Sequence, residues 1–519
     1  MKGMKKNQKA WSQYEAGKAY KRQIGLYENN RSNERLYRGE QWYGAQVSDL
    51  PKPVFNVIRR VVDFLVSSVA STDLSIRYTD ENLPYVNDET QRKAITEALE
   101  VLTKNAAYRY ERCGLETKIF KLLTDAALAG DGVIYCYWDP SVKTGQGFSG
   151  DIVTEIIDNV NLFVADVNRA DIQSQDYIIL SGRAAVSALK AEAMKNGVSP
   201  EVASSICPDR SFDTQSGDLS YTELDGEDEA KTTYIVKFWR EDGKVVFEKS
   251  TEECVIKRVQ TDCTLYPVAY FNWYPTKNSF HGTSPVTSLI PNQKYINRAY
   301  AMAMKHMTDT AFSKVVYDKS KIPEWSNGVG EAIAALGGGS IADAVSVVGV
   351  GEMQDGYMEL IDSAVTLTKE LMGATDSALG NIDANNTSAI IALQETSKVT
   401  LEQIRAAYYR CIEDMANVWV DMMCAYYPNG RLLPYKSEDG VEVACVDFEL
   451  LRQGMLSARI DVAQVARYSA VSAQNMLDKL LELGHISPSA YIRRLPAGIV
   501  RDREALVLEV EKNQKEKEE

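Results

Sequence analysis

Apolar side chains recur every three or four residues over one long stretch of the chain, from Ile390 to Tyr426. The repeating positions are Ile390, Leu393, Ser397, Leu401, Ile404, Tyr408, Cys411, Met415, Trp419, Met422 and Tyr426. This spacing matches the 3.6-residue period of an α-helix, so it predicts a long helix with one apolar face. A stripe of this kind is typical of a helix packed into a protein core rather than of a cofactor site.

Two further helices are predicted before this one, with a glycine-rich insert between them. The first begins at Ser284-Pro285, because serine caps a helix and proline fits its first turn, and Pro291 is expected to kink or restart it. The second runs from about 354 to 378. The insert contains the strand-like runs KVVYDKSKIPEW and AVSVVGVG, and a polar loop, LGNIDANNTS, follows the second helix.

The rest of the chain is mixed. With 519 residues, the protein is expected to form more than one core. Helical patterns dominate the beginning, with Asn56 as a cap, and one long helical region extends from about 88 to 128. Gly130 is expected to end that region, with a turn at Asp131 and Gly132. Short strands dominate from about 151 to 275, interrupted by an acidic loop at 208–233.

Composition excludes several classes of protein. The formal net charge is -14 and the pI is about 5.0, which argues against a surface that grips nucleic acid. The eight cysteines are scattered, so neither a zinc site nor a disulfide framework is indicated. The start of the chain lacks the apolar core of a secretory signal, and the run at 332–351 is too rich in glycine to span a membrane. We expect a soluble chain with no membrane partner.

No pattern for catalysis is visible. A phosphate-binding loop needs Gly-Lys-Ser/Thr, whereas Gly17-Lys18 and Gly243-Lys244 are followed by Ala19 and Val245. The three histidines are far apart in the sequence, and the acidic clusters lie in loop-like segments. We therefore predict no catalytic residues, no metal and no cofactor. A hydrolase with its site in the strand-rich region 151–275 remains an alternative.

The order of these elements and several local stretches resemble the portal proteins of tailed bacteriophages. The matching stretches are YRGEQWYG, LPKPVFNVIRRVVDFLVSSVASTDLSIRY, LLTDAALAGDGVIYCYWDP, HGTSPVTSLIPNQKYINRAYAMAMKHM and TDSALGNIDANNTSAIIALQETSKVTLEQI. The resemblance implies an α+β, predominantly helical fold with wing, stem, clip and crown, assembling as a ring, with twelve subunits in the capsid.

The resemblance also implies domain boundaries. The segments are 1–282 (N-terminal part of the wing), 283–312 (first stem helix), 313–351 (clip), 352–378 (second stem helix), 379–388 (tunnel loop), 389–427 (long tunnel and wing helix), 428–464 (wing strands) and 465–519 (crown and charged C-terminal tail). The acidic loop at 208–233 has no evident equivalent in this scheme.

The resemblance places the polar loop nearest to DNA, and its composition fits that position. The candidate DNA-channel residues are Asn381, Asp383, Asn385, Asn386 and Thr387. A lysine-rich loop would bind phosphates and release counterions, which makes the contact adhesive, whereas these side chains form transient hydrogen bonds. A plain interhelix turn is the alternative interpretation of the same loop.

Two other groups of residues follow from the implied architecture. Candidate channel or intersubunit charges on the stem are Lys294, Arg298, Lys305, Glu359, Asp362, Lys369 and Glu370. Candidate docking residues of the clip are Lys314, Tyr317, Lys319, Lys321 and Trp325. A two-stranded insert buries little by itself, so its strand edges are expected to pair with neighbouring subunits.

The implied function is a channel at one capsid vertex, through which double-stranded DNA is packaged and later ejected. The implied partners are other copies of the chain, DNA bound without sequence specificity, the large terminase subunit, the major capsid protein, a scaffold protein and a head-tail adaptor. The implied location is the virion, with the host cytoplasm during assembly. A virion or tail scaffold protein that does not enclose DNA is the main alternative.

Overall fold

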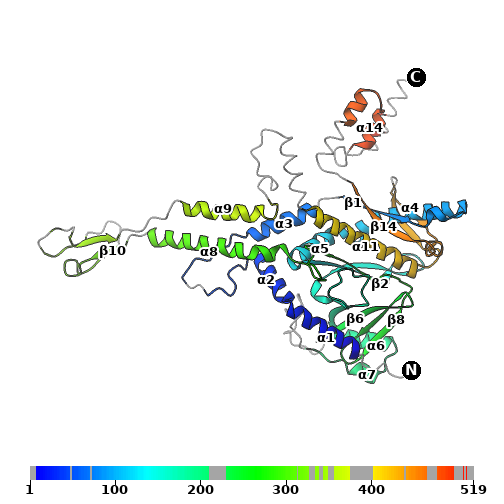
Figure 1. Cartoon of the computed structure of the whole chain (residues 1–519), viewed down its shortest axis with the longest axis horizontal. Coiled ribbons are helices and arrows are strands. Elements are labelled where there is room, and N and C mark those ends of the chain that lie inside the picture. The colour runs from blue at the N-terminus through cyan, green and yellow to red at the C-terminus, as the bar shows by residue number, and fades with distance from the viewer. Residues whose placement is uncertain are drawn as a thin grey trace.

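The computed structural model consists of an α+β body, with antiparallel sheets, and a long arm that leaves it (Figure 1). It describes residues 8–46, 49–70, 73–209, 230–311, 314–326, 333–337, 340, 343–348, 356–374, 401–437, 440–463, 476–495, 506–507 and 510. Helices α8 (Pro285–Ala311) and α9 (Gly356–Glu370) run side by side along the arm, and strand β10 (Lys314–Tyr317) lies at its tip. The predicted stem and clip residues that the structure describes therefore lie on the arm, which extends away from the body (Figure 1).

Glycines divide the N-terminal helices. Gly25 adopts a φ of 70° between α1 (Gln8–Gln23) and α2 (Leu26–Arg38). Gly114, with a φ of 59°, separates α4 (Glu89–Arg112) from α5 (Leu115–Ala129), so the helical region predicted at 88–128 is confirmed but consists of two helices with an unpredicted break. Only glycine adopts this left-handed conformation without strain, which is why the helices break there.

Helix α3 (Val57–Ala70) begins as the sequence indicates. The side-chain oxygen of Asn56 accepts a hydrogen bond from the backbone N–H of Arg59 at 3.0 Å, which satisfies one free donor of the first turn. The helix then buries one face, including Val61, Leu65 and Val69, in the main core. The predicted cap is confirmed.

The described strands form several antiparallel sheets. The five-stranded sheet has the order β4 (Leu162–Val164), β5 (Tyr177–Ala185), β6 (Lys231–Glu241), β7 (Lys244–Ser250) and β8 (Val255–Gln260), and the three-stranded sheet has the order β3 (Ser149–Ile157), β2 (Asp131–Lys143) and β9 (Val268–Asn272). Two-stranded sheets pair β1 (Asp73–Asp80) with β14 (Leu456–Ala463), β10 with β11 (Val345–Val348), and β12 (Leu432–Ser437) with β13 (Gly440–Cys445). The start of β6 shows that the acidic loop ends before Lys231, and residues 210–229 lie outside the described part of the chain.

Helix α11 (Glu402–Tyr426) lies at the centre of the core. Within the described residues, the predicted apolar stripe is buried at Ile404, Tyr408, Cys411, Met415 and Trp419, against β2, β9 and β14. The indole N–H of Trp419 donates to the Thr154 hydroxyl at 2.9 Å, so its polar atom is satisfied within the core. Residues 389–400, which were assigned to the same helix, lie outside the described part of the chain.

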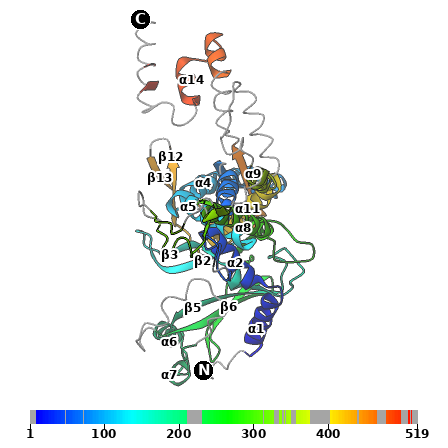
Figure 2. The ribbon, with the colours of Figure 1, turned by 90° about the vertical axis from the view of Figure 1, so that its left-hand side faces the viewer.

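Smaller elements complete the body. They are the 3-10 turns Leu83–Tyr85 and Asn159–Asn161, and helices α6 (Val186–Lys195), α7 (Pro200–Ser204), α12 (Phe448–Leu451) and α14 (Pro488–Arg494). Figure 2 shows α1, α6 and α7 beside the five-stranded sheet at one end of the molecule, and α14 at the other end. No helix among the described residues has both the length and the apolar character that crossing a membrane requires.

Gly130 ends α5 at the point where the body meets the arm. Its φ is 91°, and a Cβ placed on it would lie 2.7 Å from the carbonyl oxygen of Gly282. Asp131 and Gly132, however, begin β2 rather than forming the turn that was predicted. A single residue with positive φ is enough to reverse the chain, because the strand then pairs at once with β9.

We expect Gly130→Ala to reduce the free energy of unfolding by about 2–4 kcal/mol, because the added methyl group meets both a strained φ and rigid backbone. Gly145→Ala is the matched control, since Gly145 has a φ of 75° and nothing within 4 Å of a Cβ. Its expected cost is about 1 kcal/mol. Chemical denaturation measures both free energies of unfolding. Equal losses in the two variants would show that the close contact between the new Cβ and the carbonyl oxygen of Gly282 does not destabilise the fold.

Candidate assembly arm and its base

The two arm helices pack closely through small side chains. Ala299 and Ala303, one turn apart on α8, contact Ile361 of α9, and all three are buried. The Tyr357 hydroxyl donates to the carbonyl oxygen of Ala299 at 3.3 Å, which links the helices directly. Alanine allows the backbones to approach, so a few contacts hold an otherwise thin pair of helices.

Helix α8 starts from a buried cap, as the sequence predicts. The Ser284 hydroxyl accepts a hydrogen bond from Val286 N–H at 3.0 Å and donates to the carbonyl oxygen of Ala127 at 2.6 Å. The cap therefore ties the arm to the end of α5 as well as satisfying the first turn. The helix continues through Pro291, so it does not restart there.

Gln293, fully buried on α8, connects the arm to the start of α3. Its side-chain oxygen accepts hydrogen bonds from Val57 N–H at 3.0 Å and Ile58 N–H at 3.2 Å, two of the free donors at that helix end. Its amide nitrogen donates to the carbonyl oxygen of Phe55 at 2.7 Å and to Asn297 at 2.8 Å. One side chain thus sets the position of α8 against α3.

Asp131 organises the other side of the base. Its carboxylate is buried and accepts hydrogen bonds from His281 Nδ1 at 2.6 Å, Gly282 N–H at 2.7 Å, and the side-chain amides of Asn159 and Asn272, both at 3.0 Å. Burial raises the pKa of this carboxyl, but the opposing effect of His281 and these hydrogen bonds is larger and holds the pKa below its ordinary value. Asp131 therefore fixes the segment that leads into α8.

A second carboxyl on α5, Asp125, behaves in the opposite way. Burial, with the nearby charge of Asp158, raises its pKa from 3.8 to about 7, and Lys121 only partly opposes the change. The neutral form is therefore favoured in the folded protein. As pH rises, Asp125 loses its proton near pH 4 in the unfolded chain but only near pH 7 in the folded protein. The free energy of unfolding therefore decreases between about pH 4 and pH 7.

We expect Asp125→Asn to increase the free energy of unfolding by about 1–2 kcal/mol at pH 8 and to leave it nearly unchanged at pH 4. Denaturation at a series of pH values measures the difference between the variant and the wild type. Asp139→Asn is the control, because Asp139 is only half-buried on β2 and its carboxyl pKa is lowered, not raised, by hydrogen bonds from Ser141. A constant difference at all pH values would contradict the proposed titration.

The predicted stem charges are divided between the two helices, with Lys294, Arg298 and Lys305 on α8 and Glu359, Asp362, Lys369 and Glu370 on α9. Lys294, Arg298 and Lys305 follow one another at helical spacing on α8, and Lys305 pairs with Asp309 at 3.5 Å. On α9, Glu359 and Asp362 are exposed together on the face that also carries Ser363 and Thr366. Glu370 is exposed, whereas Lys369 is buried in the folded chain.

The arm also exposes large apolar side chains along much of its length. On α8 these are Tyr295, Met302, Met304 and Met307, and on α9 and the turn after it they are Met358, Leu360, Leu367 and Leu371. Leu371 is 69% exposed and Met307 64%. Soluble monomers rarely expose contiguous apolar surface, so this distribution is typical of an interface with another chain.

The tip of the arm is a small hairpin with its own packing. Strands β10 and β11 pair antiparallel from Lys314↔Val348 to Tyr317↔Val345. The rings of Tyr317 and Trp325 stack at a centroid distance of 5.3 Å, and Lys319 is exposed beyond the hairpin. Lys321 is half-buried, and its backbone carbonyl accepts a hydrogen bond from Leu336 N–H at 2.7 Å. The predicted docking residues thus lie at the end of the arm.

The candidate tunnel-loop residues cannot be placed in the same way. Asn381, Asp383, Asn385, Asn386 and Thr387 lie outside the described residues, as does the whole of 375–400. The predicted second helix is described as α9 only from Gly356 to Glu370, followed by a turn. The channel role of the loop stays a prediction.

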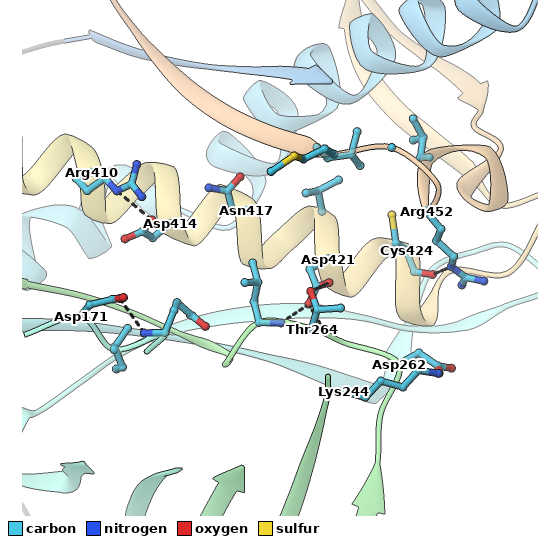
Figure 3. A pocket seen from close by; sticks show the side chains of 18 of the residues that line it. Asp171, Lys244, Asp262, Thr264, Arg410, Asp414, Asn417, Asp421, Cys424 and Arg452 are labelled. Carbon is cyan, nitrogen blue, oxygen red and sulfur yellow. Dashed lines mark hydrogen bonds and ion pairs between the residues drawn. The ribbon is translucent and has the colours of Figure 1, made fainter. Parts of the chain in front are cut away.

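A wide cleft of about 1090 Å³ lies between α11 and the loop that joins β8 to β9 (Figure 3). Asp421 accepts hydrogen bonds from the N–H and hydroxyl of Thr264, and Asp262 pairs with Lys244 at 2.6 Å. Asp414 pairs with Arg410 at 3.4 Å. The Asp421 contact joins α11 to the loop after β8, the Asp414 pair lies within α11, and each of these three carboxylates therefore already has a structural partner.

The cleft carries no arrangement that favours the hydrolase alternative. Burial raises the pKa of the Cys424 thiol to about 12, which keeps it protonated, and no histidine lines the cleft among the described residues. Burial also raises the pKa of Asp414 to about 6, in a position paired with Arg410. Among the described residues, no group of histidines, cysteines and carboxylates is suited to hold a metal ion.

Sequence reasoning missed the residues that hold the arm to the body. Asp131 was assigned to a turn, and neither Gln293 nor His281 was selected for this role. The only local signal was the run GDG at 130–132, which marks a chain reversal but not a buried acceptor. Their partners lie more than a hundred residues away, so spacing along the sequence does not reveal them.

The described chain thus combines an α+β body with a two-helix arm, a hairpin at the arm tip and a long core helix. A family model described as phage P22-like portal protein matches residues 240–468 of this chain. The arm, its tip and α11 all lie within this range. Over these residues the chain is similar to P22-like portal proteins, which confirms the resemblance found in the sequence.

A comparison with solved structures found a chain described as the neck of an empty GTA particle computed with C6 symmetry. It is 12% identical, with a TM-score of 0.36, and the alignment covers 87% of this chain and 89% of the other. No curated protein sequence matches this chain.

Proposed function

We propose that this chain is a phage portal protein that assembles as a ring at one capsid vertex and forms the channel through which double-stranded DNA is packaged and later ejected. The observation that carries the proposal is the arm, whose two helices expose both apolar and charged faces within the portal-type region. A virion location, with assembly in the host cytoplasm, follows from this role. The number of subunits that we expect is the twelve of the capsid ring implied by the resemblance.

Ring formation gives the exposed faces of the arm a partner. Residues such as Leu360, Leu367 and Met307 would be covered by the arm of the next copy, which removes apolar surface from water. The basic stripe of α8 and the acidic face of α9 have opposite charge, so a neighbour rotated about the ring axis would bring them together. Lys294 and Arg298 are then intersubunit residues rather than residues that bind DNA.

The segments keep the functions that the resemblance implies. The wing comprises 1–282 and 428–464, the stem 283–312 and 352–378, the clip 313–351, and the crown 465–519. The tunnel loop, 379–388, would be nearest to DNA, where Asn385 and Asn386 would allow the duplex to slide without strong ion pairs. The scheme places the described arm next to the channel.

The clip is proposed to dock the terminase motor during packaging and the head-tail adaptors afterwards. The described hairpin has only two strands, so each strand keeps an edge with unpaired backbone groups. Val316 is 58% exposed, which favours further pairing at this edge. The major capsid protein and a scaffold protein are the partners expected at the wing.

The experiment that tests the proposal is mass photometry of the purified protein together with negative-stain imaging. Rings with a central hole support the channel, and a variant lacking residues 314–348 should still form rings but lose binding of the terminase large subunit. A filament or a closed oligomer without a hole would overturn the proposal and favour the scaffold alternative. If only monomers are seen, adding scaffold protein must produce rings, and its failure to do so would also contradict the proposal.

A further inference from the structure

A small cavity of about 200 Å³ lies where the end of α4 meets β3 and β12, on the side of the body away from the arm tip. A buried water needs only roughly 10–15 Å³ of such space, so a group larger than one water fits. The charged residues among those that line it are Arg109, Arg112, Lys118, Arg431 and Asp151, which is four cations against one carboxylate, or a net charge of +3. This excess is unusual in a chain whose net charge is -14.

Asp151 is already the acceptor for much of this cluster. Its Oδ1 accepts hydrogen bonds from Arg109 Nη1 at 3.0 Å and from the Tyr427 hydroxyl at 2.7 Å. Arg431 Nη2 lies 3.5 Å from the same oxygen. Burial opposes ionisation of Asp151, but Arg109 and these hydrogen bonds keep its pKa below the ordinary value. The single carboxylate of Asp151 thus interacts with the guanidinium groups of both Arg109 and Arg431.

Apart from Asp151, no carboxylate of the described residues lines the cavity to balance the remaining positive charge. Arg109 Nη2 and Arg431 Nη1 donate to backbone carbonyl oxygens, which are neutral, and Lys118 donates to the carbonyl oxygen of Thr154 at 2.8 Å. The side chains of Arg109 and Arg431 are only 8% and 5% exposed. Burying cations without enough negative charge nearby is unfavourable, so a bound anion would stabilise this cavity.

One buried donor is also left without an acceptor. Arg109 Nε has no hydrogen-bond partner among the described residues, although its side chain lines the cavity. Arg112 is half-exposed at the cavity, and its closest approach to Asp151 Oδ2 is 3.9 Å, too long for a hydrogen bond. Both guanidinium groups therefore keep donors for a further acceptor.

We propose that this cavity is a binding site for a phosphate-type oxyanion, held by Arg109, Arg112 and Arg431. A dianion compensates more of the net charge than a carboxylate does, and guanidinium groups donate paired hydrogen bonds to phosphate oxygens. The phosphate is either free in solution or the terminal phosphate of a nucleic acid strand. The site does not depend on ring formation, since all its residues come from one chain.

Inorganic phosphate titrated into the full-length protein tests the proposal, with thermal denaturation and calorimetry as measurements and sodium chloride at equal ionic strength as reference. We expect saturable stabilisation by phosphate that chloride does not reproduce. Arg112→Gln should weaken phosphate binding about tenfold, and Arg112→Lys should restore part of it. Lys436→Gln, an exposed cation on β12 that pairs with Glu111 outside the cavity, should bind phosphate like the wild type.

A competition experiment distinguishes the two sources of phosphate. A short duplex with a 5′-phosphate that displaces inorganic phosphate, when the unphosphorylated duplex does not, assigns the site to nucleic acid ends. Displacement by neither duplex assigns it to free phosphate. The proposal is overturned if phosphate and chloride act alike, if Arg112→Gln binds phosphate as tightly as Lys436→Gln, or if both duplexes compete equally.

Discussion

Replacing Asp131 by alanine is expected to reduce the free energy of unfolding by about 3–5 kcal/mol. The substitution leaves four donors without their acceptor: His281 Nδ1, Gly282 N–H and the side-chain amides of Asn159 and Asn272. These groups are buried or partly buried, so water cannot fully replace the carboxylate. Denaturation by urea measures the loss.

The same variant should also loosen the start of the arm. Gly282 precedes α8 by a few residues, and its N–H is held by Asp131 at 2.7 Å. Hydrogen exchange should therefore become faster around Gly282 and Ser284 than in the five-stranded sheet. Uniformly faster exchange would mean that Asp131 contributes to overall stability without positioning the arm.

Asp139→Ala is the matched control on the same strand. Asp139 is half-buried, and among the described residues its carboxylate accepts hydrogen bonds from the N–H and hydroxyl of Ser141, so its loss should change stability by less than about 0.5–1 kcal/mol. The wild type should lose the Asp131 contribution as pH falls below the ordinary carboxyl range, because the folded-state pKa lies below the unfolded one. Asp131→Ala should lack this part of the acid sensitivity.

Local chemistry was sufficient to predict the ends of several helices. Asn56 and Ser284 cap α3 and α8 through contacts within two or three residues, and Gly130 ends α5 through its own φ. Helical periodicity likewise identified the buried face of α11. These features depend on neighbours in the sequence, which a single sequence contains.

Long-range partners could not be predicted from the same information. Gln293 lies 236 residues from Val57 and Asp131 lies 150 residues from His281, so only the folded chain brings these groups together. The break at Gly114 was missed because glycine inside a helical pattern is tolerated elsewhere. Acidic and basic residues on the arm could be assigned to helices, but which neighbour they face depends on an assembly that one chain does not contain.

Reversing the basic stripe of α8 tests that assembly directly. We expect Lys294→Glu combined with Arg298→Glu to reduce the fraction of protein in rings more than tenfold, as measured by mass photometry at fixed protein concentration and low salt. Both side chains are exposed in the single chain, so folding should be unaffected. Lys195→Glu with Lys143→Glu makes the same change of charge at exposed positions on α6 and β2 of the body and should leave rings intact.

The physical reason is that the change acts at every interface of the ring. A single exposed ion pair contributes roughly 0.2–1 kcal/mol, but reversal replaces attraction by repulsion, and about 1.4 kcal/mol per interface is already a tenfold change in association. A charge swap tests which helices face each other. Adding Glu359→Lys and Asp362→Lys to the variant with Lys294→Glu and Arg298→Glu should restore rings, because opposite charges again face each other. This rescue requires that α8 of one copy contacts α9 of the next. If the fourfold variant stays monomeric while each pair of changes alone still folds, the two stripes do not face each other. The basic residues of α8 would then be assigned to the channel wall, where ring assembly would not depend on the charge of α9.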